Sequence, residues 1–172
     1  QLELEVDLHR ALGSGELDVH YQPVVSLRTG RPVSVEALAR WHRPGHGLVP
    51  PATFVPVAER TGLFAHLGDT VLRQACRQMK AWLDLGFAID RLIVNLSPHQ
   101  LAIEDLPLRV ASIVRESGLA PDHLELDVTE SAVPRLGSGA DASLRALKRL
   151  GVHVAIDDFG TGSSSLASLR SL

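Results

Sequence analysis

The sequence predicts an α/β fold in which strands and helices alternate around a parallel sheet or a barrel. Segments of strand-like alternation are followed by segments of helical periodicity, and glycines such as Gly86, Gly118 and Gly151 end the helical segments. The 172 residues fit one domain, and a hydrophobic fraction of 45% is enough to form its core. Repeated strand and helix units are typical of parallel sheets and barrels.

Each element is predicted from a local pattern. Strands are expected where apolar and polar residues alternate, over residues 17–22, 33–40, 91–97, 123–129 and 152–158. Helices are expected where apolar residues recur at helical spacing, over residues 1–12, 57–60, 71–83, 108–116 and 144–150. Pro23 is expected to close the first strand. The Pro- and Gly-rich segment 42–56 is expected to be a loop, with His42 and His46 as loop residues rather than metal ligands.

The composition argues against several functions. With 17 basic and 20 acidic residues and a net charge of -3, the chain shows no sign of a surface for a nucleic acid polymer. It contains no apolar run long enough to predict membrane contact, although a longer parent protein could carry a membrane anchor. The single cysteine, Cys76, is expected to fill the core and suits a reducing compartment, so a cytoplasmic location is expected.

Side-chain parity divides the strands into an aliphatic face and a polar face. The aliphatic face is expected to pack under the helices; its members are Val33, Val35, Ala37, Ala39, Leu92, Val94, Leu96, Leu124, Leu126, Val128, Val152, Val154 and Ile156. The polar face is expected to lie on the interior side; its members are Glu36, Arg40, Asn95, Ser97, Asp127, Thr129 and Asp157. Because the carboxyl ends of barrel strands meet on one side, these polar groups are expected to converge.

Two arrangements would satisfy the oxygen atoms of the polar face. A cation would compensate them, since each buried polar group without a partner costs about 1 to 3 kcal/mol. Oxygen donors without His or Cys at matching positions favour Mg²⁺ or Mn²⁺ over Zn²⁺, and Asp158, beside Asp157, could reach a second ion suited to phosphate-ester hydrolysis. The alternative is a hydrogen-bonded network that includes Arg40, with Asp157 and Asp158 only starting a turn.

The sequence resembles the EAL domain family, which is named for the tripeptide found here at residues 36–38. Five ordered blocks carry the resemblance: YQPVV at 21–25, VEALARW at 35–41, VNLS at 94–97, LELDVTES at 124–131 and IDDFGTG at 156–162. The resemblance implies a modified TIM barrel whose first strand runs antiparallel to the others. It also implies a bacterial signalling enzyme that hydrolyses the second messenger cyclic di-GMP to linear pGpG.

The resemblance further implies roles for individual residues. The first Mg²⁺ or Mn²⁺ would be held by Glu36, Asn95, Asp127 and Asp157, and the second by Asp157 and Asp158. The residues expected to be catalytic are Glu36, Asp157 and Asp158. The dinucleotide would be contacted by Gln22 and Arg40, and the loop after Asp158 would be supported by Glu130.

The chain departs from the family pattern in two residues and in length. Asp127 stands where the family usually has Glu, and Ser163 stands where it usually has Tyr. About five of the eight family strands are expected within residues 1–172, and the family's lysine that positions the attacking water would follow Leu172. We therefore expect a C-terminally incomplete EAL domain that is inactive alone, within a parent domain that is an enzyme.

Two alternatives to the enzyme are a sensor that binds cyclic di-GMP without cutting it and an interaction module. The family also implies other signalling domains in the parent chain, with residues 1–12 as a connecting helix, and a homodimer.

Overall fold

The computed structural model describes residues 2–129 and 138–157. Its strands are β1 (Leu17–Val25), β2 (Pro32–Arg43), β3 (Gly47–Val49), β4 (Arg91–Leu96), β5 (Leu124–Thr129) and β6 (His153–Asp157). Its α-helices are α1 (Leu2–Ser14), α2 (Pro51–Arg60), α3 (Phe64–Asp84), α4 (Pro98–Leu101), α5 (Leu106–Ser117) and α6 (Ser138–Leu150), and η1 (Pro121–His123) is a short 3₁₀ helix. The alternation of strands and helices confirms the predicted α/β class.

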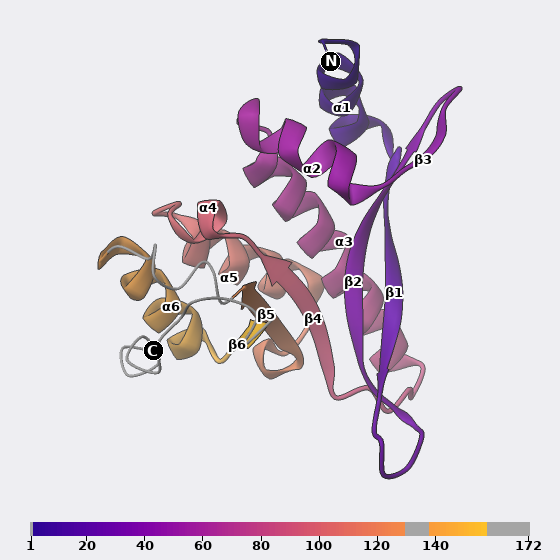
Figure 1. Ribbon diagram of the computed structural model, residues 1–172. Coiled ribbons are helices and arrows are strands. Elements are labelled where there is room, and N and C mark those ends of the chain that lie inside the picture. The colour runs from indigo at the N-terminus through magenta and orange to yellow at the C-terminus, as the bar shows by residue number, and fades with distance from the viewer. Residues whose placement is uncertain (1, 130–137, 158–172) are drawn as a thin grey trace.

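The strands form one mixed sheet with the order β1-β2-β4-β5-β6, and β3 pairs with the outer end of β2. β1 runs antiparallel to β2, whereas β2, β4, β5 and β6 run parallel to one another. Figure 1 shows β1 and β2 as a long hairpin beside the three shorter strands. An antiparallel first strand followed by parallel strands is the partial barrel that the resemblance implied.

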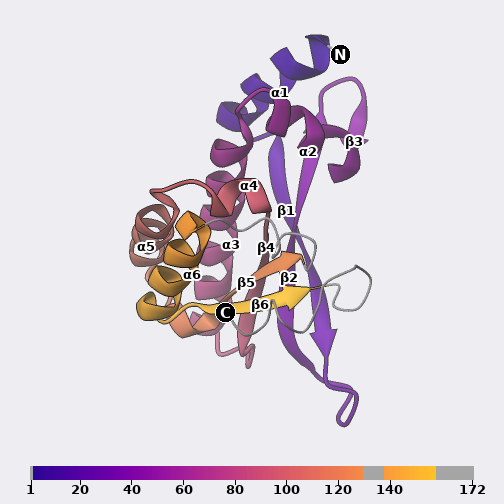
Figure 2. The same cartoon turned by 60° about the vertical axis from the view of Figure 1, so that its left-hand side comes forward.

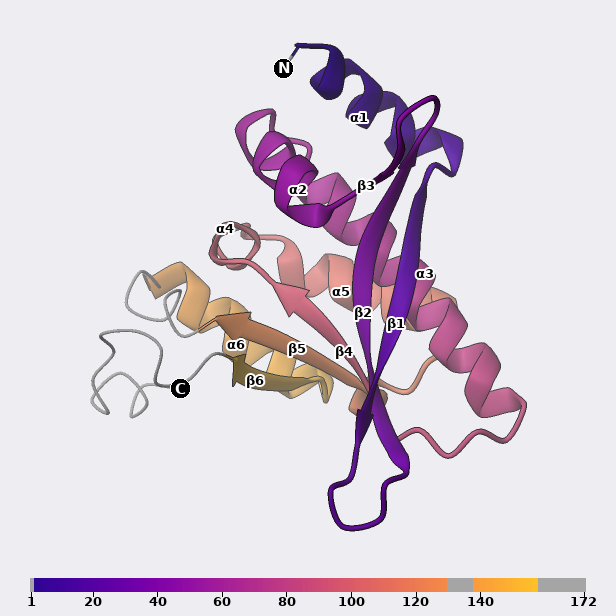
Figure 3. The ribbon, with the colours of Figure 1, turned by 45° about the vertical axis from the view of Figure 1, so that its right-hand side comes forward.

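Helices cover the aliphatic face of this sheet. In Figure 2, α3, α5 and α6 lie on one side of the strands, and Figure 3 shows α3 running behind β1 and β2. Leu92 and Leu124 of the strands are fully buried in one cluster with Met79 of α3 and Ile113 of α5. Burying a side chain of this size contributes about 1.5 to 3 kcal/mol, so this face supplies much of the stability.

Cys76 belongs to the same buried cluster and is a free thiol with no exposed surface. Burial raises its pKa to about 12, because the thiolate would lose its hydration there. The prediction that Cys76 fills the core is confirmed.

A second buried cluster joins α1 and α2 to the outer ends of β1 and β2. Trp41 is fully buried and meets Phe54 of α2 edge to face, with ring centroids 5.9 Å apart. At the last residue of β2, the guanidinium of Arg43 donates a 2.7 Å hydrogen bond to Asp7 of α1. These contacts anchor α1 to the extended end of β2.

Several element boundaries differ from the prediction. β1 continues through Pro23 to Val25. An edge strand tolerates proline because it has a neighbouring strand on one side only, so the missing N–H costs no hydrogen bond to a second strand. β2 continues to Arg43, since pairing with both β1 and β3 keeps it extended. His42 therefore lies in a strand rather than in a loop. α2 begins at Pro51, where a proline at the first helical turn sacrifices no hydrogen bond.

The polar face is more open than the sequence suggested. Asn95 is exposed, and Glu36, Arg40 and Asp127 are only half-buried. Within the described residues, β1 and β6 are the two edges of the sheet, so the strands do not close over this face. Water can therefore reach part of the polar oxygens.

Among the helices of residues 2–129 and 138–157, none is sufficiently long and apolar to traverse a bilayer.

Candidate functional site

The pairing of the parallel strands brings three predicted site residues onto one face of the sheet. Glu36 pairs with Ile93 of β4, two residues before Asn95, and Asn95 pairs with Asp127 of β5. Residues paired across a ladder, and residues two apart along a strand, have side chains on the same face. Glu36, Asn95 and Asp127, which we call the oxygen group, therefore share the polar face across three neighbouring strands.

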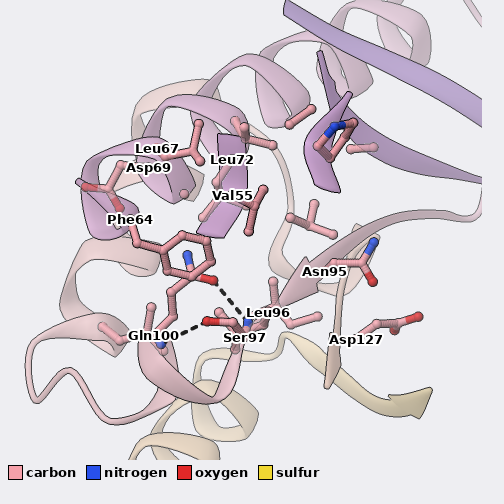
Figure 4. Close-up of a pocket in the computed structure, with 18 of the residues that line it drawn as sticks. Val55, Phe64, Leu67, Asp69, Leu72, Asn95, Leu96, Ser97, Gln100 and Asp127 are labelled. Carbon is pink, nitrogen blue, oxygen red and sulfur yellow. Dashed lines mark hydrogen bonds between the residues drawn. The ribbon is translucent and has the colours of Figure 1, made fainter. Parts of the chain in front are cut away.

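The side chains of the oxygen group also approach one another. The Asn95 Nδ2 atom donates a 2.7 Å hydrogen bond to Oε1 of Glu36, although the two residues are 59 positions apart in sequence. Asp127 has its Oδ1 atom buried and lies beside Asn95 in Figure 4. The structure thus brings Glu36 and Asn95 into direct contact and places Asp127 next to Asn95 on the same face.

Gln22 and Arg40 extend the polar face along β1 and β2. Gln22 pairs directly with Glu36 across the antiparallel ladder, whereas Arg40 lies four residues further along β2, opposite Asp18. The Arg40 Nη1 atom donates a 2.8 Å hydrogen bond to the backbone carbonyl of Ala39. In the described part of the chain Arg40 makes no ion pair with a carboxylate.

The remaining predicted site residues are less fully described. Asp157 is the last residue of β6, and its backbone pairs with Thr129, two residues past the Asp127–Ala155 pair. Asp157 therefore lies on the strand next to β5, two residues further along than the partner of Asp127. Asp158 and Glu130 lie outside the described residues, as does Ser163.

Ser97 has a different role from the one that its strand pattern predicted. It lies just after β4 and caps α4: its hydroxyl accepts a hydrogen bond from the backbone N–H of Gln100 at 3.3 Å. The Gln100 side-chain oxygen accepts in return from the backbone N–H of Ser97 at 3.1 Å. This capping box turns the chain sharply after β4 and so fixes the end of the strand that carries Asn95.

A cavity of about 360 Å³ lies beside the oxygen group, between the ends of β2 and β4 and the helices α3 and α4. Pairing between β2 and β4 ends at the Ala37–Val94 pair, and the residues that follow this pair on both strands line the cavity. Figure 4 shows Phe64, Leu67 and Leu72 on its wall, with Asn95 and Asp127 at one side. Two members of the oxygen group, Asn95 and Asp127, therefore border this mostly apolar cavity, whereas Glu36, Gln22 and Arg40 do not line it.

A tyrosine braces the strand that carries Gln22. The ring of Tyr21 packs edge-on against Trp82 of α3, with centroids 4.7 Å apart. Burial raises the pKa of Tyr21 to about 12, with smaller contributions from the charges of Asp18 and Cys76. Tyr21 is therefore a neutral packing residue that holds β1 against α3.

The structure also reveals a cluster that sequence reasoning missed. Asp18 and His20 of β1 and His42 of β2 place one potential ligand atom each within 4.8 Å of one another. Two of the three residues could have been placed together from the sequence, since Asp18 and His20 alternate with Leu17 and Val19, which are buried. The Pro- and Gly-rich composition predicts a loop at His42, whereas in the structure His42 lies in β2, two residues after Arg40 and on the same face.

A mixed sheet with an antiparallel first strand, and with oxygen donors on neighbouring parallel strands, defines a barrel-type α/β protein that has carboxylate and amide oxygens gathered on one face. The chain belongs to the EAL domain family, whose profile matches residues 5–172.

Two relatives from Pseudomonas aeruginosa illustrate the similarity. The chain is 48% identical over 175 aligned residues to the bifunctional diguanylate cyclase/cyclic di-GMP phosphodiesterase MucR, covering 100% of this chain and 25% of MucR. It is 40% identical over 172 residues to the cyclic di-GMP phosphodiesterase NbdA, covering 100% of this chain and 22% of NbdA. The chain thus spans about a quarter of the length of these relatives.

Solved structures show the same fold. The PaMucR phosphodiesterase in complex with c-di-GMP superposes with a TM-score of 0.92 at 45% identity, over 99% of this chain and 69% of that one. The EAL enzyme Bd1971 in its cAMP- and cyclic-di-GMP-bound form gives a TM-score of 0.87 at 28% identity, over 99% of this chain and 47% of that one.

Proposed function

We propose that the domain containing this chain is a metal-dependent phosphodiesterase that hydrolyses cyclic di-GMP to linear pGpG. The observation that carries the proposal is the oxygen group, in which three neighbouring strands present two carboxylates and an amide on one face. The names of MucR and NbdA, and the c-di-GMP complex of PaMucR, support the choice of substrate.

The donor atoms of the oxygen group fit a hard divalent cation such as Mg²⁺ or Mn²⁺. Both ions prefer oxygen ligands, which Glu36 and Asp127 supply as carboxylates. Because Asn95 uses its Nδ2 atom to reach Glu36, its amide oxygen remains available as a third ligand. The hydrogen bond also holds Glu36 and Asn95 close enough together to serve one ion.

We assign the metal ligands by combining this group with the motif residues near it. The first cation would be held by Glu36, Asn95, Asp127 and Asp157, and the second by Asp157 and Asp158. When bound, the cations would neutralise phosphate charge and lower the pKa of a water molecule, so that hydroxide forms at neutral pH. Of these residues, Glu36, Asp157 and Asp158 are the proposed catalytic residues.

Gln22 and Arg40 would hold the dinucleotide over the polar face. Arg40 uses one N–H to bind the carbonyl of Ala39, which aims the guanidinium and leaves its other N–H groups for a phosphate oxygen. Gln22, opposite Glu36, can offer both an amide donor and a carbonyl acceptor to a guanine edge or a phosphate. Glu130 would support the loop after Asp158, behind the metal ligands.

The decisive experiment incubates the full-length protein with cyclic di-GMP and Mn²⁺ and follows pGpG by chromatography. We expect pGpG to form, and to stop forming when the cation is removed with EDTA. Calorimetry on the same samples separates the alternatives: binding without pGpG identifies a sensor, and the absence of binding by a folded protein identifies an interaction module. Homodimerisation and further signalling domains stay predictions, which light scattering and the full-length sequence would test.

A further inference from the structure

The cluster of Asp18, His20 and His42, which we call the His–Asp cluster, lies apart from the oxygen group on the β1–β2 ladder. His20 Nε2 lies 4.0 Å from Asp18 Oδ2, and the rings of His20 and His42 have centroids 6.2 Å apart at an interplanar angle of 41°. All three residues are exposed to solvent. Their ligand atoms are therefore close together and open to an incoming ion.

Strand pairing holds the three side chains on one face. Asp18 pairs with Arg40, and the backbone N–H of His42 donates to the carbonyl of Glu16 at 2.9 Å, two residue pairs further along the ladder. Even-numbered residues of β1 pair with even-numbered residues of β2, and alternate residues of a strand share a face. Asp18, His20 and His42 therefore all lie on the polar face. The cluster is built on strands rather than on a loop, which limits how far its members can separate.

Buried residues anchor the strands from the opposite side. Leu17, Val19 and Trp41 alternate with the cluster residues and are buried against the helices. The β1–β2 ladder runs without a bulge from the Leu17–Trp41 pair to the Val24–Ser34 pair. The backbone under the His–Asp cluster is therefore held in place, and only side-chain rotation is needed to bring the ligands together.

The carboxylate of the cluster is already oriented. The backbone N–H of Val19 donates a 2.8 Å hydrogen bond to Oδ1 of Asp18, which leaves Oδ2 on the side of His20. Support of a ligand carboxylate by a hydrogen bond is a usual feature of metal sites. Arg40, which pairs with Asp18 across the ladder, directs its Nη1 atom to the carbonyl of Ala39.

The chemistry of this donor set differs from that of the oxygen group. Two imidazole nitrogens and one carboxylate suit Zn²⁺ and similar transition metals, whereas Mg²⁺ prefers oxygen alone. Ligands of a tetrahedral zinc ion lie about 3.3 Å apart, given bond lengths of about 2.0 to 2.1 Å. Exposed side chains can close the difference from 4.8 Å by small rotations. Three protein ligands leave one position for water.

We propose that Asp18, His20 and His42 form a binding site for Zn²⁺ or a related transition metal ion, distinct from the Mg²⁺ or Mn²⁺ site of the oxygen group. The inference does not rest on the proposed phosphodiesterase activity, since the site shares no ligand with the oxygen group.

The test measures Zn²⁺ binding to the full-length protein by calorimetry, with excess Mg²⁺ present to occupy the oxygen group. We compare the protein with His20→Ala, His42→Ala and the matched control His46→Ala. His46 is an exposed histidine in the turn between β2 and β3 and lies outside the cluster. We expect His20→Ala and His42→Ala to weaken one Zn²⁺ site by about tenfold or more, while His46→Ala leaves it unchanged.

A second measurement identifies the ligands directly. Co²⁺ in a site with nitrogen and oxygen ligands gives visible absorption bands, which should appear in the unmodified protein and be lost in Asp18→Ala and His42→Ala. Circular dichroism verifies that each variant is folded. Equal Zn²⁺ affinity in the protein and in the triple variant Asp18→Ala/His20→Ala/His42→Ala would overturn the proposal, whatever the outcome of the pGpG assay.

Discussion

The two faces of the sheet come from the same strands but have opposite physical roles. On the aliphatic face, Leu92, Leu124 and Leu126 are buried under helices, whereas on the polar face Asn95 is exposed and Glu36 and Asp127 are half-buried. The aliphatic face holds the strands in register, and the register then brings the polar residues together. Stability and activity should therefore respond separately to substitutions on the two faces.

The largest expected effect is on activity, from Glu36→Gln. Replacing a carboxylate of the oxygen group removes negative charge needed for the cation, so turnover of cyclic di-GMP should fall by about a hundredfold or more. The free energy of unfolding should change by less than about 1 kcal/mol, because Gln still accepts a hydrogen bond from Asn95. Glu104→Gln, at an exposed position outside the site, is the control. Unchanged turnover in Glu36→Gln would refute the proposed ligand.

The opposite outcome is expected for Leu92→Ala, on the aliphatic face. Leu92 is 0% exposed, and truncating it should lower the free energy of unfolding by about 2 to 5 kcal/mol in urea titrations. Leu108→Ala removes the same atoms from a residue of α5 that is 75% exposed, and should cost less than about 0.5 kcal/mol. Equal losses for the two variants would contradict the assignment of this face as the core.

A smaller effect is expected for Asp127→Glu. Glu is the residue usual in the family, and its longer side chain extends the carboxylate on the polar face. Turnover should therefore stay the same or rise by about threefold, which corresponds to well under about 1.4 kcal/mol in activation free energy. The measurement is the rate of pGpG formation at saturating Mn²⁺. A clear fall in turnover would show that the site is built for the shorter carboxylate.

The last expected effect is absent at neutral pH and appears only when the buried core is exposed to alkaline pH. The pKa of Cys76 rises from an ordinary 9.0 to about 12 on folding, because burial disfavours the thiolate. The unfolded chain releases this proton first, so the free energy of unfolding should decline as pH rises above 9.0 towards about 12, and should be unaffected below 9.0.

Tyr21 should add to the same decline, since its pKa is raised from 10.0 to about 12. Urea titrations from pH 7 upward would compare the protein with Cys76→Ala, for which a shallower alkaline decline is expected. Identical slopes would show that Cys76 does not titrate with unfolding.

Local patterns predicted much of the fold. Strand parity separated buried Val94 and Leu96 from exposed Asn95, because successive side chains of any strand face opposite sides. Gly118 has a φ of 70° at the end of α5, the left-handed conformation that glycine adopts most easily. The five strands along the sheet were predicted, and β3 was missed because three residues are too few to show a period.

Contacts between distant segments decided the rest. The extension of β2 to Arg43 depends on pairing with β1 and β3, so the local Pro- and Gly-rich composition led to the wrong assignment of His42. Ser97 matched the strand pattern, but the Gln100 side chain makes it a helix cap. Neither effect is visible in a short window of sequence.

The sequence by itself determined which residue types would face which side of each strand, and the order of the motifs that identify the family. Only the tertiary structure decided that Asn95 donates a hydrogen bond to Glu36 and that the ring of His42 lies near the ring of His20. The physical reason is that strand parity arises within a few covalently linked residues. Strand register and side-chain contacts, in contrast, are set by the packing of segments that lie tens of positions apart.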